Sequence, residues 1–257
     1  MIAPSPQPPT ERVIVRVEGV HKAFRQGTTV TPVLNDVELI VRGGDCVFLA
    51  GPSGSGKTTL LSIIGCICSA DRGRISILDV DIATLGFPEL AALRRDRIGF
   101  VFQRFHLVRG LTALENVCVP LILRGDEWPA ARRRALPLLE AVGLENKAKT
   151  HPRNMSAGQC QRVAIARALA ADPDLILADE PTASLDATNG QEVMELLRRL
   201  ITERGKTAIV VTHDQRIFHY ADKVYWLENG RIVQTREPVG AEMSNKGSRA
   251  NHEIGNV

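Results

Sequence analysis

Glycines, a lysine and hydroxyl residues stand close together early in the chain, in the order Gly51, Pro52, Ser53, Gly54, Ser55, Gly56, Lys57, Thr58 and Thr59. The first eight match G-x-x-x-x-G-K-[ST], a loop whose glycines let backbone N–H groups approach phosphate oxygens. An apolar run precedes the loop and a helical pattern follows it, and a helix N-terminus favours negative charge. We therefore expect residues 51–59 to bind ATP, with Lys57 reaching the β- and γ-phosphates and Thr58 ligating Mg²⁺.

Two adjacent carboxylates, Asp179 and Glu180, follow a second apolar run at residues 175–178. In a parallel sheet the carboxyl ends of the strands form the edge where ligands bind. We expect Asp179 to hold the hydration shell of Mg²⁺ and Glu180 to activate a water against the γ-phosphate. A solvated carboxylate pair at a strand end is the alternative, and the phosphate loop disfavours it.

The elements that position these residues can be read from hydrophobic periodicity. Strands are predicted where apolar residues alternate with polar ones or run together, at residues 13–20, 33–41, 46–50, 75–78, 98–102, 175–178, 207–212, 224–227 and 231–233. Helical patterns cover residues 57–66, most of 114–171, 189–204 and 215–221, with Pro137 expected to kink or split one helix. Alternating strands and helices predict an α/β fold with a mainly parallel sheet, preceded by antiparallel strands and interrupted by a helical segment.

Bulk composition excludes several classes of protein. A net charge of +3 does not predict nucleic-acid binding, and five cysteines without a CxxC pair predict reduced, buried thiols rather than a disulfide framework or zinc site. The sequence lacks an apolar run long enough to cross a bilayer. We expect a disordered lead-in at 1–11, one domain at 12–235 and a flexible tail at 236–257.

Further motifs make the chain resemble the ATP-binding subunits of ABC transporters. Met155, Ser156, Ala157, Gly158 and Gln159 resemble the signature segment LSGGQ, and the run from Asp179 to Asp186 resembles the second nucleotide motif followed by the D-loop. The resemblance covers residues 12–235. It implies a P-loop NTPase with a RecA-like sheet, an antiparallel β subdomain and a helical subdomain at 104–172.

The resemblance also implies roles for single residues. Gln103 corresponds to the Q-loop glutamine near Mg²⁺, His213 to the histidine that contacts the γ-phosphate, and Phe24 to the aromatic that stacks on adenine. Catalysis would then depend on Glu180, His213, Gln103 and Lys57, because phosphoryl transfer is mostly positioning and charge stabilisation. Thr58, Gln103 and Asp179 would surround the metal.

A head-to-tail homodimer follows from the same resemblance. Each ATP would lie between the phosphate loop of one subunit and the signature, Ser156 to Gln159, of the other, with the D-loop residues Ser184, Leu185 and Asp186 nearby. Ala157 departs from the usual glycine. A β-carbon would be unfavourable at positive φ and acceptable in a helix, and we expect the helical case with activity intact.

The segments 98–117 and 212–222 resemble one subgroup, the ATPases of lipoprotein-release, macrolide-export and glycolipid-export systems. This implies a separate permease, of the four-span type with a large external domain, docked around residues 102–121. The ATPase would then lie peripherally on the cytoplasmic side of the inner membrane and drive export or mechanical extraction of cargo.

Non-transport ATPases that act on nucleic acid or ribosomes are the main alternative. Those of DNA repair carry long coiled coils or zinc modules, and those of translation carry two cassettes in one chain. A third reading is a P-loop kinase with an accidental signature match. The sequence leaves the cargo undetermined.

Overall fold

Two long strands open the chain, which this computed structural model describes for residues 12–237. β1 (Val13–Gln26) pairs antiparallel with β2 (Thr29–Arg42) and with β4 (Arg72–Ile77), and β5 (Val80–Asp81) completes a sheet of order β2-β1-β4-β5. Val37, Leu39 and Val41 of β2 are buried and alternate with exposed residues, as expected for a strand with one solvated face. This is the antiparallel subdomain that the sequence predicts.

The second sheet has the order β10-β9-β3-β8-β7-β6 and contains the strands that carry the predicted site. Its central strands β3, β7 and β8 are apolar and almost entirely buried, as in parallel sheets covered on both faces. The pairs of β3 with β8 and β9, and of β7 with β6 and β8, are parallel, and the edge strand β10 is antiparallel. The strands of this sheet are β3 (Cys46–Ala50), β6 (Ile98–Val101), β7 (Leu175–Asp179), β8 (Thr207–Val211), β9 (Lys223–Glu228) and β10 (Arg231–Arg236).

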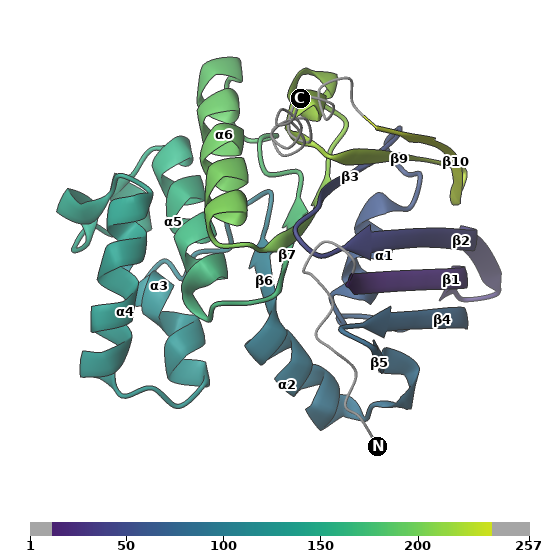
Figure 1. The fold of residues 1–257 in the computed structure, drawn as a ribbon, viewed down its shortest axis with the longest axis horizontal. Coiled ribbons are helices and arrows are strands. Elements are labelled where there is room, and N and C mark those ends of the chain that lie inside the picture. The colour runs from purple at the N-terminus through teal and green to yellow at the C-terminus, as the bar shows by residue number, and fades with distance from the viewer. Residues whose placement is uncertain (1–11, 238–257) are drawn as a thin grey trace, which may run out of the picture.

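The helices cover this second sheet and form a separate group beside it. The α-helices are α1 (Lys57–Ile64), α2 (Phe87–Arg97), α3 (Ala113–Leu123), α4 (Trp128–Ala141), α5 (Ala157–Ala170) and α6 (Ala187–Glu203). Short 3₁₀ segments lie at Ile82–Thr84, Glu145–Lys147, Pro152–Asn154 and Gln215–Tyr220. Figure 1 shows α3, α4 and α5 together at one end of the molecule and β1, β2 and β4 at the other, with the parallel strands between them.

The fold class predicted from the sequence is confirmed, with two differences in the elements. The helix α2 was not predicted, because none of its residues is fully buried and its apolar contact with the core is limited, with Leu90 and Leu93 only partly buried there. Pro137 does not split its helix: α4 runs continuously from Trp128 to Ala141, since one missing backbone N–H removes one hydrogen bond. The predicted lead-in and most of the predicted tail lie outside the described residues.

The helical group α3, α4 and α5 is inserted between the neighbouring strands β6 and β7. Apolar residues of these helices, among them Val117, Leu121, Leu139 and Ile165, belong to the same buried cluster as Ala178 of β7. The insertion is thereby packed against the strand that carries Asp179. Within residues 12–237, no helix combines the length and the apolarity needed to cross a membrane.

Candidate functional site

The loop between β3 and α1 fits its surroundings closely, and two of its glycines explain why. Gly51 has a φ of 144°, and a β-carbon there would collide with the backbone carbonyl of Leu227. Gly56 has a φ of 104°, and a β-carbon there would lie 2.7 Å from a methyl group of Leu34. Both positions therefore require glycine on conformational and steric grounds.

Lys57 begins α1 and turns back over the loop that precedes it. Its Nζ donates hydrogen bonds to the carbonyl oxygens of Gly51, at 2.9 Å, and Pro52, at 2.7 Å. The residue is 6% exposed. Burial lowers the pKa of Lys57, against the opposing influence of the Glu180 and Asp179 carboxylates. The ammonium group is thus held at the loop in a partly desolvated position, where a phosphate charge would interact with it strongly.

Thr58 and Asp179 meet across the gap between α1 and the end of β7. Thr58 Oγ1 donates to Asp179 Oδ1 at 3.0 Å. Burial raises the pKa of Asp179, and the hydrogen bond from Thr58 acts in the opposite direction. Two of the three predicted metal ligands therefore lie within hydrogen-bond distance of each other although they are far apart in the sequence.

Glu180 adopts an unusual backbone conformation immediately after β7. Its φ is 47°, in the left-handed region that non-glycine residues seldom occupy. Its Oε1 lies 2.8 Å from Nδ1 of His213, which follows β8. Because an ionised carboxylate can only accept, the imidazole donates in this hydrogen bond. A strained residue held by several contacts is a common feature of reactive sites.

A cavity of about 820 Å³ brings most of the predicted residues together. Its lining comprises Val33, Pro52, Ser53, Gly54, Gly56, Lys57, Thr58, Thr59, Gln103, Glu180 and His213. Val33, on β2, was not predicted from the sequence. Its place beside Gly56 results from tertiary packing, and a valine in an alternating strand gives no local signal for such a role.

Phe24 lies outside the lining of this cavity. Its ring is 49% exposed, so it is accessible for stacking. The ammonium of Lys22 lies 5.5 Å from the ring centroid, and Lys22 is itself paired with Asp71 at 2.8 Å. The cation lies over one face of the ring, an arrangement that is attractive through the ring quadrupole.

The segment after β6 that contains Gln103 is held by two other parts of the chain. Ser184 Oγ donates to the backbone carbonyl of Gln103 at 3.0 Å. Arg167 of α5 donates to the carbonyls of Phe105 and His106, at 2.7 and 2.6 Å, and both of those residues have positive φ. The predicted D-loop and the predicted Q-loop are therefore in direct contact within one subunit.

The predicted signature lies at the start of α5 and not in the lining of the cavity. Ser156 is the N-cap: its Oγ accepts from the backbone N–H of Gln159, whose side chain accepts in turn from the N–H of Ser156. Ala157 is the first helical residue, so the helical conformation expected there is confirmed. Leu185 and Asp186 precede α6, and Asp186 caps that helix through the N–H of Asn189.

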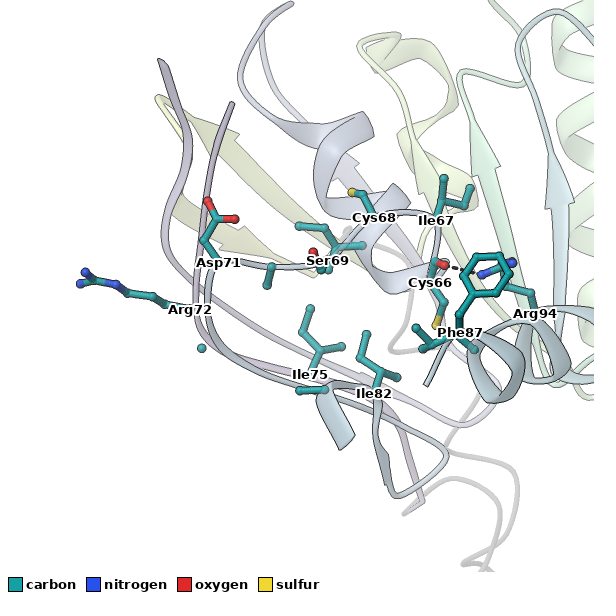
Figure 2. A pocket seen from close by; sticks show the side chains of 15 residues that line it. Cys66, Ile67, Cys68, Ser69, Asp71, Arg72, Ile75, Ile82, Phe87 and Arg94 are labelled. Carbon is teal, nitrogen blue, oxygen red and sulfur yellow. Dashed lines mark hydrogen bonds between the residues drawn. The ribbon is translucent and has the colours of Figure 1, made fainter. Parts of the chain in front are cut away.

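A second cavity, of about 470 Å³, lies between the end of α1, strand β4 and helix α2. Figure 2 shows Cys66 and Cys68 on its wall, with Phe87 and Arg94 of α2 beside Cys66, whose backbone carbonyl accepts a hydrogen bond from Arg94. Burial raises the pKa of the Cys66 thiol to about 11 and also raises that of Cys68. The five cysteines are free, and these two are poor nucleophiles at neutral pH, in agreement with the prediction of reduced thiols.

A third cavity, of about 490 Å³, lies between α2, α3 and the segment after β6. Its wall is apolar at Ile67, Val119 and Leu123 and carries the guanidinium groups of Arg94 and Arg95. Ile67 and Leu123 are 56% and 65% exposed. Part of the segment predicted to dock a permease belongs to the core instead, because Leu114, Val117, Cys118 and Leu121 are buried. Another part lines the third cavity, called the docking groove below, at Phe102, His106, Val119 and Pro120.

Comparison of the sequence with known proteins identifies a family of nucleotide-binding proteins, in agreement with the geometry of the site. A family described as ABC transporter matches residues 34–183. The chain is 45% identical over 91% of its length to a macrolide export ATP-binding/permease protein, MacB 1/2, of Paracoccus denitrificans, and covers 35% of that protein. It is 43% identical over 85% of its length to an uncharacterised ABC transporter ATP-binding protein, MJ0796, of Methanocaldococcus jannaschii, of which it covers 95%.

A solved structure of an ATP-binding cassette is similar to this chain in both fold and sequence. The dimeric, post-hydrolysis structure of the ATP-binding cassette MJ0796, bound to ADP and Pi, has a TM-score of 0.81 and 42% identity, and the match covers 87% of this chain and 98% of that one. The chain spans about a third of the length of the MacB relatives that it matches. It belongs to the ABC transporter family, and within that family it is an ATP-hydrolysing nucleotide-binding cassette.

Proposed function

We propose that this cassette hydrolyses ATP in the cavity between the Gly51–Thr58 loop and Glu180, and that hydrolysis drives a membrane permease. The observation that carries the proposal is the convergence of Lys57, Glu180 and His213 on one cavity from three separate elements. A phosphate-binding cation, a carboxylate and an imidazole at one place are the groups that phosphoryl transfer to water requires.

Each group has a distinct task in the proposed reaction. Backbone N–H groups of the loop and Lys57 bind the β- and γ-phosphates. Glu180 accepts a hydrogen bond from the attacking water and polarises it, and His213, 2.8 Å from Glu180, orients that carboxylate and contacts the γ-phosphate. The charge that develops on the transferred phosphoryl group is then stabilised by groups already in position, which is the main source of catalysis in such sites.

The residues present fit Mg²⁺. Hydroxyl, carboxylate and amide oxygens are the ligands that this ion prefers, and Thr58 Oγ1 already lies 3.0 Å from Asp179 Oδ1. Gln103 lines the same cavity as Thr58. Thr58, Gln103 and Asp179 would therefore surround the ion directly or through water, and when bound it would neutralise charge on the β- and γ-phosphate oxygens.

The proposed active form is a homodimer with ATP between the subunits. The MJ0796 cassette, 42% identical, is dimeric in its solved structure. In this chain Ser156 and Ala157 are exposed at the N-terminus of α5, and a helix N-terminus is a natural anion site. Ser156 to Gln159 would contact the ATP bound to the partner subunit, and Ser184 to Asp186 would lie along the contact between subunits.

The proposed transport partner is a permease of the kind named in the MacB relatives, which are export ATP-binding/permease proteins. The groove beside α2 and α3 supports docking, because its exposed apolar residues are flanked by Arg94 and Arg95. An apolar segment with an acidic residue would be complementary to it. A cassette bound there would lie peripherally on the cytoplasmic side of the membrane. A four-span permease with a large external domain is the expected form.

Co-purification tests the transport proposal. The Glu180→Gln protein is expressed in the native host, membranes are solubilised with ATP and Mg²⁺, and the proteins that co-purify are identified. A four-span permease with a large external domain is the expected result. Recovery of a six-span permease would support the transport proposal and contradict the proposed MacB-like subgroup. Ribosomes or DNA-bound proteins without any permease would contradict transport.

The docking groove can be tested with Leu123→Glu in the same Glu180→Gln background. A carboxylate in the middle of an apolar contact is costly to desolvate, so permease recovery should fall roughly tenfold or more. The matched control is Val233→Glu on β10, which is 57% exposed and distant from the groove. Equal recovery with Leu123→Glu and with the control would show that the permease binds elsewhere.

The signature alanine gives a separate prediction for Ala157→Gly. Because Ala157 is the first helical residue, glycine should leave the ATPase rate within about twofold and should lower stability by less than the roughly 0.5–1 kcal/mol that it costs in a helix interior. Steady-state hydrolysis and thermal unfolding measure the two effects. A manyfold rise in hydrolysis would mean that the active form needs a backbone conformation that alanine resists.

A further inference from the structure

Gln161 is a buried polar residue of α5 that the reaction described above does not use. Its side chain is 0% exposed, and its Nε2 donates to the backbone carbonyl of Pro181 at 2.9 Å. Within residues 12–237 no group donates to its Oε1, which is also buried. Exchanging the amide O and N would place two acceptors against each other, so the hydrogen bond to Pro181 fixes the orientation of the side chain.

The carbonyl that Gln161 holds belongs to the residue directly after Glu180. Glu180 has a φ of 47° and needs its surroundings to keep that conformation. Its N–H donates to the carbonyl of Val211 at 2.9 Å, and its own carbonyl accepts from the N–H of Ala183 at 3.2 Å. These bonds fix the chain on the β8 side and within the turn. The amide of Gln161 fixes the chain from α5, at the Pro181–Thr182 peptide, which is the second peptide after Glu180.

The other end of this connection is the signature. Ser156 caps the same helix on which Gln161 lies, and the helix between them is continuous. The helix is buried along much of its length, at Cys160, Val163, Ala164 and Ile165 among others. Because close-packed helices move as rigid units, a displacement of the signature is carried to Gln161 with little loss.

We propose that Gln161 is a positioning residue that links the signature of each subunit to the catalytic carboxylate of the same subunit. The inference rests on the proposed homodimer, in which the signature contacts the ATP of the partner. Occupancy of the partner's ATP then sets the position of α5, and Gln161 transfers that position through Pro181 to Glu180. The two ATP sites are thereby coupled, and each hydrolyses fastest when the other is filled.

The residue type fits this task. A glutamine side chain supplies a donor at the distance of the Pro181 carbonyl without burying a charge, whereas methionine has a similar length and volume and cannot donate. Gln161→Met should therefore preserve packing and remove the link. Arg162→Met is the matched control, because Arg162 is the next residue of α5 and pairs with Glu192 on the surface side.

The test measures hydrolysis by the full chain as a function of ATP concentration. We expect a cooperative curve for the unmodified protein. Gln161→Met should lower kcat by roughly 10- to 100-fold, since small displacements of reacting groups have effects of this size. Its half-saturating ATP concentration should stay within about twofold of the unmodified value, its Hill coefficient should fall towards about 1, and Arg162→Met should change none of these.

Thermal unfolding, with and without ATP, separates this role from a loss of folded protein. If Gln161→Met does not fold, Gln161→Asn keeps a buried amide that is too short to reach Pro181, and the same results are expected of it. A variant with unchanged kcat and Hill coefficient, or one that loses activity only in proportion to unfolded protein, would overturn the inference.

The proposed dimer is tested separately from the role of Gln161. Gel filtration of Glu180→Gln with ATP shows whether the sandwich dimer forms at all. A dimer that forms and hydrolyses ATP cooperatively, with Gln161→Met indistinguishable from the unmodified protein, would contradict the role of Gln161 alone. A monomer under these conditions would contradict the dimer, and the coupling with it.

Discussion

Replacing Glu180 by Gln should lower the rate of ATP hydrolysis roughly 100-fold or more and leave ATP binding nearly unchanged. Removing a general base or a water-polarising carboxylate has an effect of this size. The amide of glutamine is isosteric with the carboxylate. Its oxygen can still accept from Nδ1 of His213, which lies 2.8 Å from Glu180 Oε1 in the unmodified protein. Phosphate release measures the first quantity, and calorimetric titration with ATP measures the second.

Glu203→Gln is the matched control for this experiment. Glu203 lies at the end of α6, where it forms an exposed ion pair with Arg199 at 3.9 Å. Exposed pairs of this kind contribute little to stability, so the same chemical change there should leave hydrolysis unaffected. Retention of more than about a third of the activity by Glu180→Gln would assign the polarising role to another group.

Replacing Lys57 by Met should weaken the binding of ATP strongly and the stability of the protein much less. Losing one partner of a buried charge pair costs about 2–5 kcal/mol in binding, or roughly 30- to 4000-fold in affinity for ATP. Folding loses much less, because Met also removes the desolvation of an ammonium group that is 6% exposed. The rise in unfolding temperature that ATP produces should therefore become much smaller, while the temperature without ATP should change less.

Lys206→Met controls for the loss of a lysine elsewhere. Lys206 forms an ion pair with Asp172 at 2.8 Å, remote in sequence from the loop. That variant should keep the full ATP-induced rise in unfolding temperature. If Lys57→Met retains the same rise, its ammonium group does not bind phosphate.

The class of fold could be predicted from the sequence because its parallel strands are nearly continuous apolar runs, such as Leu175–Ala178 in β7. The order of the strands could not, because pairing between distant segments leaves no local pattern. Helix α2, in contrast to the apolar strands, could not be predicted from the sequence. None of its residues is fully buried and only Leu90 and Leu93 pack partly against the core, so its apolar pattern is too short to identify a helix.

The site could be predicted to the extent that its residues belong to contiguous motifs. The loop at 51–59 and the pair Asp179 and Glu180 lie at the ends of the strands expected to carry them. Contacts between distant segments could not be predicted in this way. The bond of Gln161 to Pro181 and that of Ser184 to Gln103 join segments whose spacing in the sequence carries no information about their contact.

The position of β3 in its sheet has a consequence for synthesis. β3, which leads into the phosphate loop, is flanked by β8 and β9, and Gly51 packs against the carbonyl of Leu227. A ribosome makes the loop early and its neighbours late, and domains of this kind complete their folding after such long-range pairing is possible. The nascent chain therefore cannot form the complete nucleotide site until residues beyond Glu228 have emerged. ATP can stabilise the finished cassette, but it cannot guide the folding of the half that carries the loop.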